Sequence, residues 1–111
     1  MEKIICLIKE PSKPIKWARI CNDLHTLQRI AANGGFIETV TFDNKVVVIC
    51  DEEGLLKNLP YCCTVGDLHF FGTVIFAGVK DEDFADLDLK VTEFAKYVPA
   101  SDKRKEDTWE D

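Results

Sequence analysis

The residues best equipped for chemistry in this sequence are five cysteines and two histidines. Cys50, Cys62, Cys63 and His69 together have the donor atoms of a tetrahedral zinc site. Adjacent cysteines rarely direct both sulfurs at one ion, however, and the paired Cys-x-x-Cys spacing is absent. A nucleophilic pair of Cys63 and His69 also lacks a flanking signature. We therefore expect reduced, packed thiols, with no metal, no cofactor and no catalytic residue.

Two runs of three acidic residues are the next candidates. Carboxyl groups act as general acids or bases where an apolar pocket raises their pKa, whereas acidic runs at turns are nearly always solvated. The alternative to simple solvation is a surface that binds a basic partner. Residues 1–50 carry seven basic and five acidic side chains, a net +2, and residues 51–111 carry seven and fifteen, a net −8. This asymmetry would steer a basic protein. The predicted partner-binding residues are Asp51, Glu52, Glu53, Asp81, Glu82 and Asp83.

The acidic balance also limits the classes of partner and the location. Binding duplex nucleic acid requires positive charge facing the phosphates, so we expect no direct duplex binding. No run of about 20 apolar residues occurs, so we expect no membrane span. The opening residues MEKIICLIKE are too short and too charged for a secretory signal, and we expect a cytoplasmic protein.

Two neighbouring glycines, Gly34 and Gly35, come after a predicted helix. One glycine is enough to end a helix, because glycine reaches the left-handed conformation without steric cost. The second glycine has two interpretations. It lets the helix pack closely on the next strand, or its N–H group joins that of its neighbour to bind an anion with Lys16 and Arg19. No Walker or dinucleotide fingerprint is present, so close packing is favoured and anion binding is the alternative.

Hydrophobic periodicity predicts a small α+β domain that positions these candidates. Asn22 or Asp23 can cap a first helix, and Asp83 can cap a second helix that ends at Pro99. The expected architecture is an antiparallel or mixed sheet of about five strands with two helices, in the order β-β-α-β-β-β-α. The strands are expected at residues 3–9, 15–21, 36–42, 45–50 and 69–78.

The same pattern divides the chain into one domain and a tail. Residues 1–99 are expected to form a single domain, since cores split only at much greater lengths. The strand at 45–50 has no polar alternation, so we expect it to be covered on both faces. Residues 55–64 are expected to be irregular. Residues 100–111 are charged and lack any apolar period, so we expect a disordered tail.

Several short motifs resemble an uncharacterised family. They are the Gly34-Gly35-aromatic-Ile-Glu block, the Glu-Glu-Gly turn ending at Gly54 and the Leu-Pro pair at residues 59–60. The resemblance covers about residues 3–85. Members are short proteins of Gram-positive bacteria, their phages and conjugative elements, assigned to a domain of unknown function. Many members have polar residues where this chain has Cys62 and Cys63. The resemblance implies a cytoplasmic accessory protein that antagonises host defence or modulates host machinery, and it transfers no catalytic residue.

The sequence therefore predicts a non-enzymatic binding protein of a phage or mobile element. The leading hypothesis is a counter-defence or host-modulating inhibitor whose acidic second half occupies a host protein. The alternative is a small-ligand binder that sequesters a nucleotide signal at Gly34 and Gly35 with Lys16 and Arg19. Exposed edge strands in so small a sheet also favour a homodimer.

Overall fold

The computed structural model describes residues 2–88 and, as a strand, residues 105–110. Within these residues the chain forms a seven-stranded sheet, a two-stranded sheet and one short helix. The prediction of an α+β fold with two helices is therefore wrong, because the protein is mostly β. The elements are β1 (Lys3–Lys9), β2 (Lys16–Cys21), α1 (Leu24–Ala32), β3 (Ile37–Phe42), β4 (Val46–Asp51), β5 (Tyr61–Val65), β6 (Leu68–Phe71), β7 (Val74–Lys80), β8 (Asp83–Ala85) and β9 (Lys105–Glu110).

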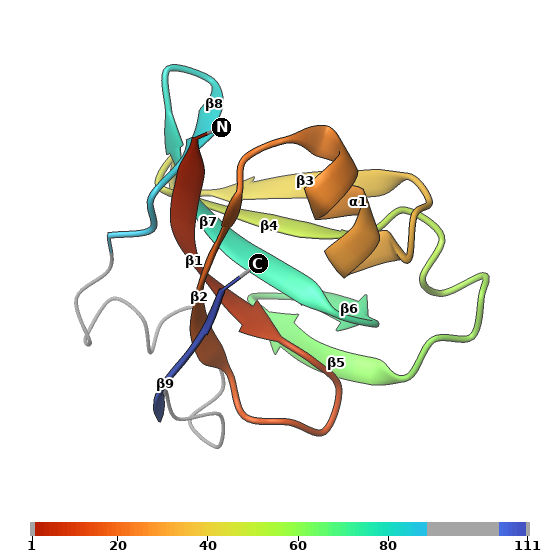
Figure 1. Ribbon diagram of the computed structural model, residues 1–111. Coiled ribbons are helices and arrows are strands. Elements are labelled where there is room, and N and C mark those ends of the chain that lie inside the picture. The colour runs from red at the N-terminus through yellow and green to blue at the C-terminus, as the bar shows by residue number, and fades with distance from the viewer. Residues whose placement is uncertain (1, 89–104, 111) are drawn as a thin grey trace.

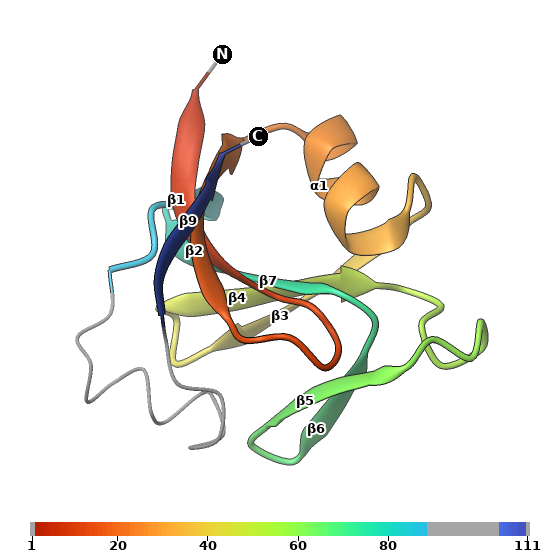
Figure 2. The same cartoon turned by 60° about the horizontal axis from the view of Figure 1, so that its bottom comes forward.

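The large sheet has the strand order β3-β4-β7-β1-β2-β9, and β8 pairs with the end of β7. The pairing of β2 with β9 is parallel, and the other pairings described are antiparallel. Helix α1 covers one face of this sheet and the hairpin β5–β6 covers the other (Figures 1 and 2). The edges of the large sheet are β3 and β9, and a homodimer through an edge stays a prediction.

Strand β4 shows how the two faces are filled. All of its residues are buried, which confirms the prediction that this strand is covered on both faces. Val46, Val48 and Cys50 pack in a cluster with the hairpin β5–β6, whereas Val47 and Ile49 pack in a second cluster with α1. Successive side chains of a strand point to opposite faces, so an unbroken apolar run serves two cores at once.

The ends of helix α1 are set by its own sequence. Asp23 is the N-cap: its Oδ1 accepts a hydrogen bond of 2.9 Å from the backbone N–H of Thr26. That hydrogen bond holds the pKa of the Asp23 carboxyl below its usual value. Asn33 ends the helix with a left-handed φ of 48°. The helix therefore begins at the predicted cap Asp23, whereas the left-handed residue that caps its end is Asn33 and not the glycine that was expected.

The second half of the chain departs most from expectation. Residues 83–85 form β8 instead of beginning a helix, and the rest of the predicted second helix lies outside the described residues. Phe84 packs against the cluster under α1 and Leu87 belongs to the cluster under the hairpin, so this segment places apolar side chains on both sides. The backbone N–H of Leu87 also bonds the carbonyl of Ile5 at 2.8 Å. These tertiary contacts favour extended chain over helix.

Three further segments differ from expectation. The predicted strand at 69–78 is two strands, β6 and β7, separated at Gly72, which has a φ of +83° and donates its N–H to the carbonyl of Pro60 at 2.8 Å. Strand β5 lies in a segment expected to be irregular. No strand was predicted in residues 100–111, and the structure has β9 there, paired with β2.

Candidate functional site

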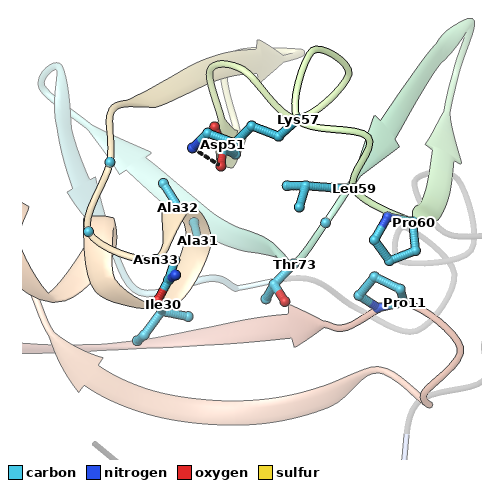
Figure 3. A pocket seen from close by; sticks show the side chains of 13 residues that line it. Pro11, Ile30, Ala31, Ala32, Asn33, Asp51, Lys57, Leu59, Pro60 and Thr73 are labelled. Carbon is cyan, nitrogen blue, oxygen red and sulfur yellow. Dashed lines mark hydrogen bonds and ion pairs between the residues drawn. The ribbon is translucent and has the colours of Figure 1, made fainter.

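A hollow lies between the end of α1 and the loop that connects β4 to β5. We call it the helix-end cavity. Its volume is about 690 Å³. Figure 3 shows Leu59, Pro60, Pro11 and Thr73 facing the helix end across it. The full lining is Pro11, Ile30, Ala31, Ala32, Asn33, Gly34, Gly35, Asp51, Lys57, Leu59, Pro60, Gly72 and Thr73.

One wall of the helix-end cavity is the last turn of α1 and the two glycines after it. The N–H of Gly34 donates to the carbonyl of Gln28 at 3.0 Å, and the N–H of Gly35 donates to the carbonyl of Ala32 at 2.8 Å. Both glycine donors are therefore used to close the helix. A nest of free N–H groups, which an anion would require, is not formed by this pair.

Gly35 is also a point of close approach. A Cβ at this position would lie 3.2 Å from the carbonyl oxygen of Ala32 and 3.3 Å from Nζ of Lys57. These distances are tighter than most contacts that real Cβ atoms make, so glycine permits the crowding. The nearest atoms belong to the helix end and to Lys57 and not to β3, so packing of the helix on the next strand through Gly35 stays a prediction.

The opposite wall is organised by Asp51 at the end of β4. Its Oδ1 accepts from the backbone N–H of Glu53 at 2.8 Å, and its Oδ2 lies 2.9 Å from Nζ of Lys57. The Asp51 side chain is 3% exposed and that of Lys57 is 40% exposed. This buried carboxylate therefore fixes the start of the loop and draws an ammonium group to the cavity (Figure 3).

The loop itself is held by short-range hydrogen bonds and one close contact. The N–H of Lys57 donates to the carbonyl of Glu53 at 2.8 Å, and that of Leu59 donates to the carbonyl of Gly54 at 3.0 Å. A Cβ on Gly54 would lie 2.9 Å from the carbonyl oxygen of Phe71. The loop can therefore lie against β6 only because residue 54 is glycine.

The predicted ligand-binding residues are brought together only in part. Gly34 and Gly35 line the helix-end cavity, but Lys16 and Arg19 do not. Both basic residues lie on β2, where they are opposite Ile8 and Ile5 of β1. The cation that does line the cavity is Lys57, which sequence reasoning missed. The sequence feature that could have indicated the Asp51–Lys57 pair is a lysine six residues after an aspartate, across a turn that contains Gly54.

The six predicted partner-binding residues form two separate groups. Strands β4 and β7 are antiparallel neighbours, so Asp51–Glu53 and Asp81–Asp83 lie at opposite ends of the sheet (Figure 1). Glu52 and Glu53 are exposed, whereas Asp51 is buried. Asp81, Glu82 and Asp83 are all exposed. Glu82 and Asp83 line a second hollow of about 290 Å³ together with Glu2, Asn22 and Phe84.

The thiols serve packing more than chemistry. A register shift between Tyr61 and Cys63 lets both Cys62 and Cys63 enter the core cluster of the hairpin. Cys63 is 1% exposed, whereas His69 is exposed and its Nδ1 lies 2.8 Å from the hydroxyl of Thr64. Cys63 and His69 therefore do not share one accessible site. Among the described residues, no group of three or more histidine, cysteine or acidic side chains could hold a metal ion.

Burial changes the acidity of two thiols. It raises the pKa of Cys6 to about 12, with a smaller contribution from Asp86. It raises the pKa of Cys50 to about 11, and the nearby Glu38, Asp51 and Cys63 add to the effect. A thiol is nucleophilic as the thiolate, so both groups are poor nucleophiles at neutral pH.

Fold and cavity define a small, mostly β domain with a mixed apolar and charged hollow at one helix end. Residues 3–98 match the family described as "Domain of unknown function (DUF3846)", and the chain belongs to that family. The resemblance to a family of unknown function is thereby confirmed. No curated protein and no solved structure is similar enough to serve as a relative. In the part of the chain that the structure describes, no helix has the length and apolarity needed to cross a bilayer.

Proposed function

We propose that this protein is a non-enzymatic binding protein that holds a small molecule in the helix-end cavity. The observation that supports this most is the cavity, whose volume is about 690 Å³. Ligand sites in proteins span roughly 300–1,000 Å³ and combine apolar walls with a few placed polar groups. Here Leu59, Pro60 and Ile30 supply apolar wall, and Asp51 and Lys57 supply charge.

Rigid surroundings favour binding at this place. The helix end is capped, and Asp51 and the hydrogen bonds of the loop hold the facing wall. A site whose walls are held in place loses little conformational entropy when a ligand enters. The raised pKa values of Cys6 and Cys50 are consistent with binding in place of covalent catalysis.

The biological setting is proposed from the resemblance of the motifs around Gly34 and Gly54. Short family members in Gram-positive bacteria, phages and conjugative elements suggest an accessory protein in the cytoplasm of a bacterial host. A protein of this kind that sequesters a nucleotide-type signal would weaken a host response without any turnover. It would act in proportion to its own concentration.

A thermal-shift screen against nucleosides and nucleotides tests the proposal. Free ligand at 100 times its Kd should add about 2.7 kcal/mol to the free energy of unfolding. Thr73→Trp places a large ring in the cavity and should abolish the shift. Thr39→Trp, on the exposed face of β3, is the matched control and should preserve it. The absence of any shift across the panel would contradict the proposal.

A second candidate function is binding of a basic host protein through the hairpin β7–β8. It is favoured by the hollow in which Glu82, Asp83 and Glu2 gather three carboxylates. Reversal of Asp81, Glu82 and Asp83 to lysine should abolish capture of such a partner. Reversal of Glu52 and Glu53 at the other end of the sheet is the control. Equal capture by both variants would exclude this surface.

A further inference from the structure

The helix-end cavity has an electrostatic character that the glycine pair alone does not suggest. It lies at the C-terminal end of α1, since the lining begins with the last turn of that helix. The last carbonyl groups of a helix point away from its body and carry the negative end of the helix dipole. The N–H groups of Gly34 and Gly35 donate to the carbonyls of Gln28 and Ala32, which offsets part of this negative end and leaves neither N–H to hold an anion.

Acceptors also lie on the facing wall. The carboxylate of Asp51 is 3% exposed and lines the cavity, and each of its oxygens has one donor from the protein. A carboxylate oxygen has two lone pairs, so each retains capacity for a second donor. The hydroxyl of Thr73 and the amide of Asn33 can accept as well.

Lys57 indicates what this environment attracts. Its Nζ lies 2.9 Å from Asp51 Oδ2 and 3.3 Å from the position that a Cβ on Gly35 would occupy. The ammonium group is thus placed between the buried carboxylate and the end of the helix. The side chain belongs to the protein, but its position marks a place where a donor with positive charge is stabilised.

We propose that the ligand is a small molecule recognised through a hydrogen-bond-donating, neutral or cationic group, such as the amino group of a nucleobase, and not through a phosphate. This inference rests on the proposed function and names the chemistry of the same cavity. The amino group lies against Asp51 and the helix end, and the flat apolar body lies against Leu59 and Pro60. Lys16 and Arg19 take no part, because they do not line the cavity.

Calorimetry with matched probes tests the inference on the full chain. Adenosine carries a 6-amino group, inosine carries an oxygen there, and adenosine 5′-monophosphate adds a phosphate. We expect adenosine to bind at least tenfold more tightly than inosine. The phosphate should change the affinity less than threefold, with little dependence on salt.

Lys57→Met should change the affinity in opposite directions for a ligand recognised through an amino group and for one recognised through a phosphate. The substitution keeps an apolar stem and leaves Asp51 to pair with the ligand, so an amino ligand such as agmatine or adenosine should bind several-fold more tightly. A phosphate-led ligand should bind more weakly. Lys16→Met and Arg19→Met are the controls and should leave the affinity unchanged, and thermal melting of each variant checks the fold.

Three results would overturn the inference. Equal binding of adenosine and inosine would remove the amino group as the recognised feature. Binding that depends on phosphate, and that weakens in Lys57→Met or Arg19→Met, would restore anion recognition while leaving a ligand site in place. Failure of every probe to bind in calorimetry, together with no thermal shift across the nucleoside and nucleotide panel, would overturn the proposed function together with the inference.

Discussion

Two acidic triplets with nearly the same composition end two neighbouring strands and behave differently. Asp51-Glu52-Glu53 lies at the end of β4, and Asp81-Glu82-Asp83 comes directly after β7. In the first, Asp51 is buried and its carboxylate holds both the N–H of Glu53 and the ammonium of Lys57. In the second, every residue is exposed. The first triplet builds a wall of a cavity, and the second faces solvent.

The difference comes from the chain segment after each triplet. Beyond Glu53, Gly54 allows the loop to lie against β6, and Lys57 returns to Asp51. Beyond β7 the chain reverses within two residues, since Lys80 is paired with Asp83. Such a short turn leaves no length for a basic side chain to fold back on the carboxylates. A run of charges therefore acquires a structural role only where the next residues can neutralise one of its members.

The largest expected effect is that of removing the buried carboxylate. Asp51→Ala deletes two charge-assisted hydrogen bonds and leaves Lys57 without this partner, and we expect a loss of about 2–3 kcal/mol in the free energy of unfolding. The estimate is below that for a fully buried pair because the Lys57 side chain is 40% exposed. Urea denaturation measures it. Asp83→Ala, in the exposed triplet, should change stability by less than about 0.5 kcal/mol. Similar losses in both variants would remove the distinction between the triplets.

The glycine that allows the first loop gives the next effect. In Gly54→Ala the new Cβ would lie 2.9 Å from the carbonyl oxygen of Phe71, so the loop or β6 must shift. We expect a loss of about 1–3 kcal/mol, measured by urea denaturation. Gly78→Ala is the counterpart beside the second triplet, where the new Cβ would overlap the carbonyl oxygen of Asp86. There we expect faster hydrogen exchange of the Leu87 amide, because segment 85–87 must move away. An unchanged exchange rate of the Leu87 amide would contradict the expected movement of segment 85–87.

The contrast between the triplets also shows how far the sequence predicts this fold. The predicted strands at 3–9 and 45–50 and the helix after Asp23 agree with β1, β4 and α1, because each is set by local pattern and capping. Segment 83–88 could not be predicted from Asp83 and the spacing of Phe84 and Leu87. That spacing suits a helix face equally well, and the bond from Leu87 to Ile5 decides the outcome.

Only part of the candidate site could be predicted from the sequence: the two glycines, but not the cation. Gly34 and Gly35 were recognised as a special turn, and they line the helix-end cavity. Their expected cations, Lys16 and Arg19, lie elsewhere, because proximity along the chain says little about a site formed by separate segments. Lys57 stands 22 residues after Gly35, and only the path of the loop brings its ammonium group to the glycine.

A smaller effect concerns the thiol beside the first triplet. The pKa of Cys50 is raised from 9.0 to about 11, mainly by burial and in part by Glu38 and Asp51. Two pKa units mean about a hundredfold less thiolate at neutral pH, so alkylation of native Cys50 should be slow and half-buried Cys21 should react first. Mass spectrometry of iodoacetamide-treated protein measures both. The neutral thiol is favoured in the fold, so stability should fall as pH rises from about 9 to about 11. Equal labelling of Cys50 and Cys21 would contradict the predicted difference in alkylation rate.

The smallest expected effect is stabilising and belongs to the second triplet. Glu82 has a φ of 70°, in the left-handed region where a side chain such as glutamate is strained and glycine is not. Asp81 already has a φ of 51°, so Glu82→Gly creates an Asp-Gly turn of the kind that two-residue hairpins prefer. We expect a gain of about 0.5 kcal/mol, since relief of strain exceeds the added freedom of the unfolded chain. Asn58→Gly, at a φ of 58° in the loop of the first triplet, should gain less because asparagine tolerates this conformation. A loss of stability in Glu82→Gly would mean that the Glu82 side chain makes a stabilising contact at the hairpin. The second triplet would then share a structural role with the first.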